Sequence, residues 1–318
     1  MVKKIGLKII NTILIFAVVF SVGYSLKYII LKSQIFFNAK FQSKSTHDKG
    51  YSMLLKTKNN EVVRDVNIYL KKGEDYNYIF EFSNDSDEDS MFELVIDCNY
   101  DRIPFLNPDS GEKVLKHKFK VDKKSYVEIP ISIDNKTFQF SLNPIIFTMS
   151  EVSDKESALN NKSYSVRYDV ITEKNEIANL SADSDFKYIE NKNTFGGVLI
   201  NQEFEKVDEY LFPNSKITAQ KGELVKIAIR AYSDTDDSLF WLQIDNMRVQ
   251  FLDSKNYIYF YNVKNSVIYK EIAFNAPEKQ GMYSIYGYFA LEPLNQYNNN
   301  NPGDHLVKTS NKLLLEVK

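Results

Sequence analysis

The chain has 318 residues, of which 43% are hydrophobic and 14% aromatic, a size and composition that favour about two packed domains. Eight Lys and one Asp give residues 1–49 a charge of +7, which leaves −9 for the other residues, since the net charge is −2. An acidic main portion argues against nucleic acid as the partner, because neutralising phosphates requires a basic face. The single cysteine, Cys98, excludes an intramolecular disulfide and a cysteine-based zinc site.

The N-terminus carries an uncharged apolar run, residues 9–26, preceded by Lys3, Lys4 and Lys8. Eighteen helical residues span about 27 Å, close to the ~30 Å hydrocarbon core of a bilayer. We therefore expect residues 1–31 to be a single-pass membrane anchor with a cytoplasmic N-terminus, and residues 32–47 to be a tether. The bulk of the chain would then be extracytoplasmic. The alternative is a signal sequence cleaved after Ser25, which would release a secreted protein.

Beyond the tether, apolar and polar residues alternate with a period of two, and Asn, Asp, Gly and Lys clusters interrupt the alternation. Strands are predicted at residues 51–57, 64–70, 76–83, 91–100, 114–121, 125–133, 137–149 and 164–171. A second series is predicted at 196–203, 215–219, 224–232, 239–250, 257–262, 266–274, 282–291 and 306–317. Short, regularly spaced strands indicate an all-β fold of β-sandwiches, Ig-like in general form.

Residues 72–107 and 220–253 resemble each other: both open on Lys-Gly-Glu, break at an acidic cluster and close on Phe-Leu. The offset between matching residues falls along the chain, from 149 at Gly73/Gly222 through 146 at Phe105/Phe251 to 143 at Tyr126/Tyr269. Ordered matches with small deletions indicate an internal tandem duplication. We therefore predict a first sandwich at 48–172, a linker at 173–193 and a second sandwich at 194–318.

Motifs of the common enzyme classes are absent from the sequence, which has neither a Gly-x-Ser-x-Gly element nor a phosphate-binding glycine loop. The three histidines, His47, His117 and His305, lack metal-ligand spacing. His117 lies between two lysines, which favours a solvated strand face. Cys98 falls on the apolar side of its alternation, so we expect a buried, unreactive thiol.

Two acidic clusters are candidate calcium sites, because alternating carboxylates can supply several of the oxygens that the ion requires. The alternative is a pair of solvated turns in which Asp and Ser side chains cap the bend. The candidate ligands are Asp85, Asp87, Asp89, Asp234, Asp236 and Asp237. We predict no other cofactor.

Aromatic residues alternate along the strands expected in the second sandwich. Trp241 aligns with Glu93 of the first copy, so we expect this position to face outward. An outward aromatic face suits a sugar ring or a protein partner. The alternative is that these rings pack between the two domains or within the second core. The candidate binding residues are Trp241, Tyr257, Tyr259, Tyr261, Tyr286 and Tyr288.

Together these features predict a noncatalytic binding protein on the surface of a Gram-positive bacterium. Its expected partners are an envelope protein, a membrane complex or a cell-wall glycan. The alternative is a carbohydrate-active envelope enzyme, or a regulator of one, that uses dispersed carboxylates, since paired carboxylates hydrolyse glycosidic bonds.

Overall fold

The computed structural model describes residues 50–152, 163–176, 178–190, 197–202, 216–295 and 307–318. The predicted anchor at 1–31, the tether at 32–47 and the cleavage position at Ser25 lie outside these residues. The part of the chain that the structure describes contains no helix with the length and apolarity needed to cross a bilayer. Its regular structure is β-strand, apart from the 3₁₀ helix η1 (Asn135–Thr137).

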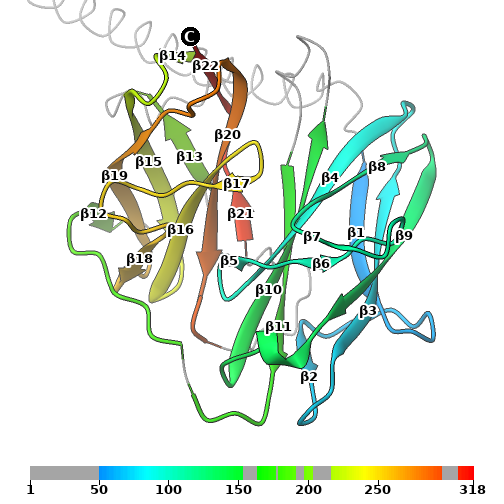
Figure 1. Cartoon of the computed structure of the whole chain (residues 1–318). Coiled ribbons are helices and arrows are strands. Elements are labelled where there is room, and N and C mark those ends of the chain that lie inside the picture. Colours follow the sequence, from blue (N-terminus) through cyan, green and yellow to red (C-terminus); the bar gives the residue numbers. More distant parts are fainter. Residues whose placement is uncertain (1–49, 153–162, 177, 191–196, 203–215, 296–306) are drawn as a thin grey trace, which may run out of the picture. The chain divides into compact units, whose positions relative to one another are not determined.

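The first group of strands forms two facing sheets (Figure 1). One has the order β1-β3-β9, with β1 at Tyr51–Lys56, β3 at Tyr76–Asn84 and β9 at Ser125–Ile133. The other has the order β2-β11-β10-β4-β5, with β2 at Asn67–Tyr69, β11 at Ser163–Ile171, β10 at Leu142–Val152, β4 at Ser90–Cys98 and β5 at Asp101–Arg102. Strand β8 (His117–Val121) also pairs with β4, and β6 (Phe105–Leu106) pairs with β7 (Lys113–Val114).

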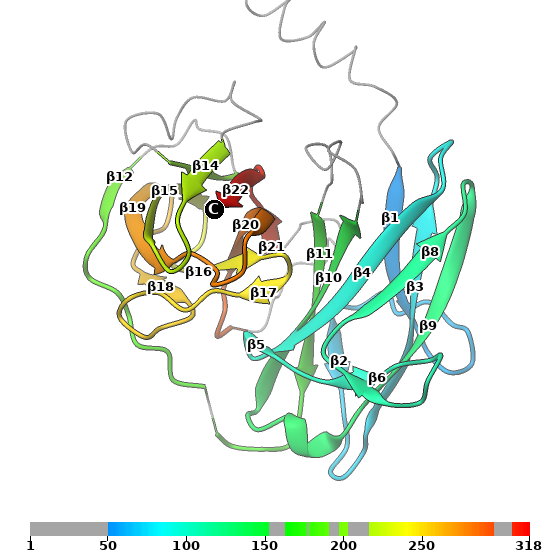
Figure 2. The ribbon, with the colours of Figure 1, turned by 45° about the horizontal axis from the view of Figure 1, so that its top comes forward.

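The second group repeats this arrangement (Figure 2). One sheet has the order β12-β19-β15-β13, with β12 at Lys187–Glu190, β19 at Ser266–Asn275, β15 at Leu224–Ser233 and β13 at Val198–Asn201. The other has the order β14-β22-β20-β16-β17, with β14 at Lys216–Ala219, β22 at Leu313–Val317, β20 at Gly281–Leu291, β16 at Asp237–Ile244 and β17 at Met247–Arg248. Strand β18 (Ile258–Tyr261) also pairs with β16, and β21 (Val307–Thr309) with β20.

The strand connections correspond between the two halves. In each half a short early strand runs parallel to the last strand, β2 beside β11 and β14 beside β22, while the other pairings are antiparallel. In the first half the sheet with β1, β3 and β9 faces the sheet with β4, β10 and β11, and in the second half the sheet with β13, β15 and β19 faces the sheet with β16, β20 and β22. This is an immunoglobulin-like arrangement, to which the second half adds β12. The all-β, sandwich-like prediction is therefore confirmed.

Equivalent turns also have equivalent contacts. Gly73 and Gly222 adopt positive φ angles of 80° and 66°, which glycine does without steric cost. The carboxylate of Glu74 accepts a hydrogen bond from the Lys71 amide, and that of Glu223 accepts one from the Gln220 amide. The shared Lys-Gly-Glu sequence is therefore a turn signal with the same mechanism in both halves.

The register differs in one place from the sequence match. Ser125 lies opposite Asn84, and Ser266 lies opposite Ser233, at the start of β9 and β19 respectively. Aligned on these residues, the two strands are displaced by two positions from the match between Tyr126 and Tyr269. A shift of two keeps each side chain on the same face of the sheet, because successive strand residues alternate.

Several predicted elements differ in extent from those observed; the strands predicted at 114–121 and 306–317, for example, are each interrupted. The predicted strand at 239–250 is a hairpin, because Asp245 and Asn246 both have positive φ, the signature of a tight two-residue turn. The predicted strand at 137–149 begins only at Leu142, after η1, whose first turn is capped by Asp134. The predicted linker at 173–193 contains β12, which pairs with β19.

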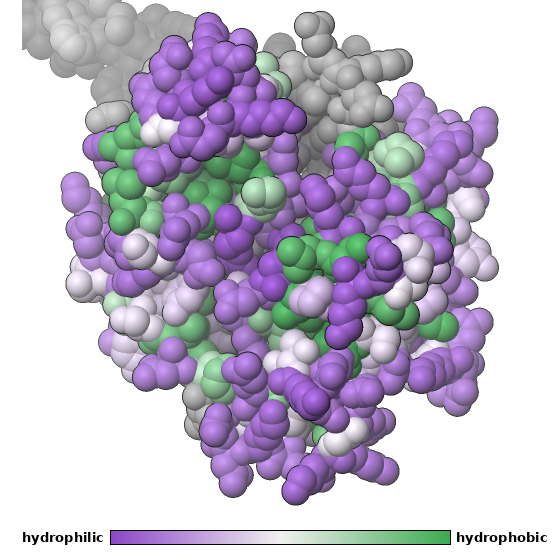
Figure 3. Space-filling model, in the orientation of Figure 1, coloured by the Kyte–Doolittle hydropathy of each residue, from purple (hydrophilic) through white to green (hydrophobic). Residues whose placement is uncertain are grey.

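Each sandwich has its own apolar core, whereas the face drawn in Figure 3 is covered mainly by hydrophilic residues. In the first core, Phe80 stacks on Phe147 with ring centroids 4.9 Å apart. In the second, Gly287 lies against Phe240, where an added Cβ would come within 2.7 Å of the ring. Packing this close makes Gly287 sterically necessary for the fit between β16 and β20.

A third apolar cluster joins the two sandwiches through the outer faces of their larger sheets. Its buried members are Tyr100, Ile146, Leu239, Trp241, Tyr286, Tyr288, Ala290 and Val307. Hydrogen bonds cross the same interface: the Ser163 and Tyr288 hydroxyls are 2.8 Å apart, and the Asn246 amide donates to Glu93 at 2.8 Å. The first sandwich therefore contributes mainly polar groups and the second mainly aromatic ones.

Arg167 is the most fully engaged polar residue of this interface. Its guanidinium, with no exposed area, forms a two-pronged ion pair with Asp169 at 2.6 and 3.0 Å. It also donates to the carbonyls of Leu291 at 2.7 Å, Glu292 at 3.1 Å and Asn295 at 3.3 Å. Arg167 thereby fixes the end of β20, in the second sandwich, to β11 in the first.

Replacing Arg167 with Met removes the guanidinium and keeps much of the side-chain volume. We expect the free energy of unfolding to fall by about 3–5 kcal/mol, because Asp169 then stays buried without its arginine. Denaturant titration measures this loss. Lys226→Met is the matched control, since its pair with Glu271 at 2.9 Å is exposed on both sides and such pairs contribute about 0–1 kcal/mol. Equal losses in the two variants would contradict the assigned role.

Candidate ligand-binding site

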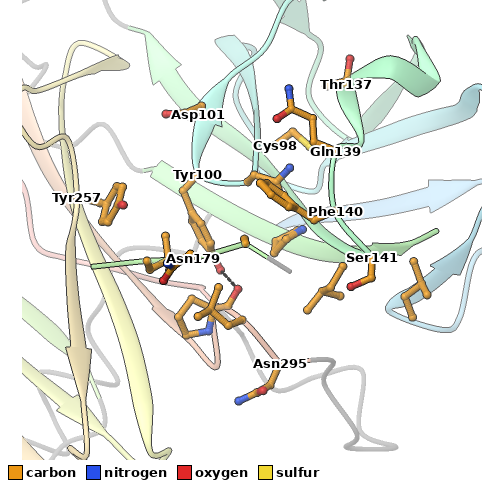
Figure 4. Close-up of a pocket in the computed structure, with 18 of the residues that line it drawn as sticks. Cys98, Tyr100, Asp101, Thr137, Gln139, Phe140, Ser141, Asn179, Tyr257 and Asn295 are labelled. Carbon is orange, nitrogen blue, oxygen red and sulfur yellow. Dashed lines mark hydrogen bonds between the residues drawn. The ribbon is translucent and has the colours of Figure 1, made fainter. Parts of the chain in front are cut away.

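A pocket of about 600 Å³ opens where the two sandwiches meet. This volume falls within the range of roughly 300–1,000 Å³ that small-molecule sites occupy. Four segments of the first sandwich and the linker contribute: the β4–β5 turn, residues 137–142, Ile171 and residues 178–180. The second sandwich contributes Tyr257 and residues 293–295 (Figure 4).

Tyr100 is a pocket-lining residue of which only 2% is exposed. With Asn99 it makes the tight turn between β4 and β5, where both residues have positive φ angles. Its hydroxyl donates to the Pro293 carbonyl at 3.1 Å, the dashed contact in Figure 4. Its ring lies 5.8 Å from that of Trp241, so the wall continues into the aromatic interface. Burial raises the pKa of Tyr100 above its ordinary range, which keeps the phenol neutral.

Half-buried aromatic rings and exposed amides complete the lining. Phe140 and Tyr257 lie on either side of Tyr100 in the view of Figure 4. The amide side chains of Gln139, Asn179 and Asn295 come from three different segments and are exposed. The pocket therefore combines flat apolar surfaces with groups that can both donate and accept hydrogen bonds.

The electrostatics of the lining are close to neutral. Asp101 is the single carboxylate among the described lining residues, and it accepts a hydrogen bond from Asn256 at 3.1 Å. Burial raises the pKa of Tyr257, and the nearby Asp101 adds to the effect. Burial, with smaller contributions from Asp97 and Asp101, raises the pKa of Cys98 to about 12. The thiol is therefore protonated and unreactive at neutral pH, in agreement with the sequence-based expectation.

The segments that line the pocket are held in place by contacts outside it. Arg167 binds the carbonyls of residues 291, 292 and 295, as described above. The linker is fixed on both sides of residues 178–180: the Glu176 carbonyl accepts from the Ser141 amide at 2.7 Å, and the Asp183 amide donates to the Tyr259 carbonyl at 2.8 Å. The site is therefore largely formed before any ligand arrives.

The predicted outward aromatic face is wrong for four of its six residues. Trp241 and Tyr288 have no exposed area, and Tyr259 and Tyr286 are each 6% exposed. Trp241 stacks on Tyr288 with centroids 5.4 Å apart, and the guanidinium of Arg248 lies 4.8 Å from the Trp241 ring centre. The rings of Trp241, Tyr286 and Tyr288 are buried because this face of the sheet packs against the first sandwich, which is the alternative that the sequence left open.

Glu93, the residue aligned with Trp241, is also buried at 3% exposure. Its carboxylate accepts from Asn246 and lies 3.5 Å from the Lys116 ammonium. The prediction that this position faces solvent is therefore wrong in both copies. Of the remaining two candidates, Tyr257 lines the pocket and Tyr261 is exposed away from it.

The acidic clusters do not converge as calcium ligands. Lys124 pairs with Asp87 at 3.2 Å, and Asp89 pairs with Lys120 at 2.7 Å and accepts from the Lys123 amide. Asp85 is exposed, and its backbone carbonyl accepts from Lys124. In the described ranges no three His, Cys, Asp or Glu side chains lie close enough to hold a metal ion.

In the second cluster Asp234 and Asp236 are exposed, whereas Asp237 is buried and accepts from the Tyr259 hydroxyl at 3.1 Å. The calcium prediction therefore has no support at either turn. Backbone-capping by Asn84 and Ser233 gives both turns their shape, since Ser86 and Thr235 donate their amides to these side chains.

His117 also differs from its predicted environment. It is 5% exposed and stacks on Phe119 with centroids 5.4 Å apart. Burial lowers its pKa, which the more distant Asp109 only partly offsets. Lys116 and Lys118 are exposed, whereas His117 between them points to the buried face of β8. The predicted solvated environment is therefore right for the lysines and wrong for His117.

Comparison with protein-family models and with curated proteins finds no match to this chain. Among solved structures, red sea bream transglutaminase is similar at 9% identity and a TM-score of 0.23, over 88% of this chain and 32% of that one. The C-terminal domain of the Streptococcus pyogenes antigen I/II-family protein AspA is similar at 8% identity and 0.23, over 84% and 99%. A family 123 glycoside hydrolase from Clostridium perfringens is similar at 10% identity and 0.24, over 38% and 27%. Similarities this low assign no function to the chain.

Asp237 provides a pH test of the second acidic turn. Burial raises its pKa above the ordinary 3.8, and Asp236 adds to the effect, while the hydrogen bond from Tyr259 opposes it. A carboxyl with a raised pKa in the folded state contributes stability at low pH that is lost as the pH rises through that pKa. Asp237→Asn keeps an acceptor for Tyr259 and removes the charge. We expect this variant to be at least as stable as wild type at pH 7, with a flatter stability profile from about pH 4 upward.

Thermal unfolding between pH 4 and 7 measures this profile. Asp234→Asn, an exposed change in the same turn, serves as the control and should leave the profile unchanged. Asp237→Asn could instead be less stable than wild type at pH 7, with the same pH dependence. That result would show that the charged carboxylate stabilises the folded state, contrary to the expectation.

Proposed function

We propose that this protein is a noncatalytic binding protein of a bacterial cell surface, which takes its ligand in the pocket between the two sandwiches. The observation that carries the proposal is the pocket itself, with its aromatic wall and three amides supplied by segments far apart in the sequence. Sites built from few polar groups on a largely apolar, pre-formed surface are typical of ligand recognition.

The chemistry of the lining supports binding over catalysis. Hydrolysis of a glycosidic bond uses two carboxyl groups that flank the bond, about 5–9.5 Å apart. Among the described residues of the pocket only Asp101 carries a carboxylate, and the Cys98 thiol is protonated. The alternative of an enzyme with dispersed carboxylates therefore receives no support at this site.

We further infer that the two halves arose by duplication of one sandwich module, with residues 48–172 and 194–318 as its copies. The matching strand orders and the matching Lys-Gly-Glu turns support this inference. Glu93 in the first copy corresponds to Trp241 in the second. Divergence at the contacting faces would have turned two similar modules into one asymmetric pair with a pocket at its edge.

The apolar run at residues 9–26 supports a location at the membrane, with residues 50–318 outside the cell. The single, buried Cys98 makes this testable by labelling, since the wild-type chain offers no accessible thiol. We expect Lys58→Cys to react with a membrane-impermeant maleimide on intact cells, because Lys58 lies on an exposed turn. Lys4→Cys should react only after lysis.

Wild type measures the background in this experiment. Labelled Lys58→Cys protein in the culture medium would indicate cleavage near Ser25 instead of anchoring. Labelling of Lys58→Cys only after lysis would place residues 50–318 in the cytoplasm and refute the proposed location.

Filling the pocket tests the proposed site. Ala178 is a half-buried lining residue, so Ala178→Trp places a large ring in the cavity. We expect retention of the detergent-solubilised full chain on isolated cell envelopes to fall at least about tenfold, the equivalent of 1.4 kcal/mol. Lys221→Trp, on an exposed turn of the second sandwich, adds the same ring elsewhere and should have no effect. Equal retention of both variants would refute the pocket as the binding site.

A further inference from the structure

The charge of the pocket restricts the chemistry of its ligand. Its described lining contains no Lys, Arg or His, so nothing there would pair with a phosphate or carboxylate. Asp101, the single carboxylate side chain of the described lining, would repel an anion. Anionic ligands bind where guanidinium or ammonium groups offset their charge. The lining therefore favours an uncharged ligand.

The polar side chains of the pocket suit a ligand with hydroxyl groups, because a hydroxyl both donates and accepts hydrogen bonds. Gln139, Asn179 and Asn295 each present two N–H donors and a carbonyl acceptor, and a hydroxyl can use both kinds. These amides are exposed and come from three separate segments. In the view of Figure 4 Asn179 lies beside Tyr100, whereas Gln139 and Asn295 lie at opposite ends. An extended ligand with hydroxyls along its length meets this requirement.

The aromatic residues add a second requirement. Phe140 and Tyr257 are half-buried rings that line the same cavity. Flat rings of this kind contribute large contact areas at a low entropic cost. A pyranose ring has apolar C–H faces between its hydroxyl edges, and it would place those faces on the aromatic rings.

From these observations we infer that the pocket binds an uncharged oligosaccharide, with the amides of Gln139, Asn179 and Asn295 on hydroxyls of different sugar units and the ring of Tyr257 on a C–H face. This inference rests on the proposed function and names the ligand class for the same site. Asp101 acts as a specificity residue that excludes acidic sugars. A neutral peptide, the competing ligand with amide and apolar groups, becomes an outcome of the test.

The experiment uses the full chain in detergent and titration calorimetry with maltotriose, chitotriose, glucuronic acid and a neutral alanine hexapeptide. We expect at least one neutral trisaccharide to bind and glucuronic acid and the peptide not to bind. Asn179→Leu and Gln139→Leu should each weaken trisaccharide binding at least about tenfold. Both side chains are exposed, so unfolding temperatures should not change.

Two further variants sharpen the assignment. Gln250→Leu removes an exposed amide outside the pocket and should leave binding unchanged. Asp101→Asn retains an acceptor for Asn256 and should allow glucuronic acid to bind while leaving the neutral trisaccharide unaffected. Binding of glucuronic acid to wild type, or trisaccharide binding that the Leu variants do not weaken, would overturn the inference.

Failure of the ligand class can be separated from failure of the proposed function. If no saccharide binds but Ala178→Trp still abolishes retention on envelopes, the pocket is a binding site for another class and this inference is wrong. Peptide binding that Asn179→Leu weakens would lead to the same conclusion. If neither saccharides nor envelopes bind wild type, both the ligand class and the proposed function fail.

Discussion

The buried guanidinium of Arg167 is the contact on which the relation between the two halves depends. Removing a guanidinium from water is costly unless its charge and its donors are all met. Asp169, on the same strand, neutralises it, and three carbonyls from residues 291–295 take the remaining donors. Because those carbonyls belong to the second sandwich, the N–H donors of Arg167 are all satisfied only when the halves are docked. The same segment lines the pocket, so docking and site formation are coupled.

Strand positions and the sandwich fold could be predicted from the sequence, because alternation and turn residues are local signals. Which strand faces lie in solvent and which lie in the interface between the sandwiches could not be predicted. Glu93 was expected to face solvent, yet it is buried against the second sandwich, as are the polar residues Ser163 and Arg167. Period-two alternation separates the two faces of a strand, but it cannot distinguish a face in water from a polar face in an interface. Strand β16 is buried on both faces, so Trp241 lies in the interface although it alternates with the core residues Phe240 and Leu242.

The pocket lay beyond sequence reasoning for a related reason. Tyr100, Gln139, Asn179 and Asn295 are brought together by tertiary packing of four segments, and no spacing in the chain records it. Two local signals were available. Asn99 and Tyr100 follow a long strand at a turn, and the predicted linker carried apolar residues such as Leu180 that a solvated linker would not need. Of the predicted binding residues only Tyr257 reaches the site, since it ends the loop that faces the β4–β5 turn.

The mutual coverage of the two larger sheets has a consequence for how this chain meets other copies of itself. Here the linker supplies the partner of each face within one polypeptide, at a high effective concentration. The two faces therefore associate at any concentration of the protein, because both belong to the same chain. Severing the linker would leave the sandwiches as two separate fragments, with Leu239 and Trp241 uncovered on one of them when they part.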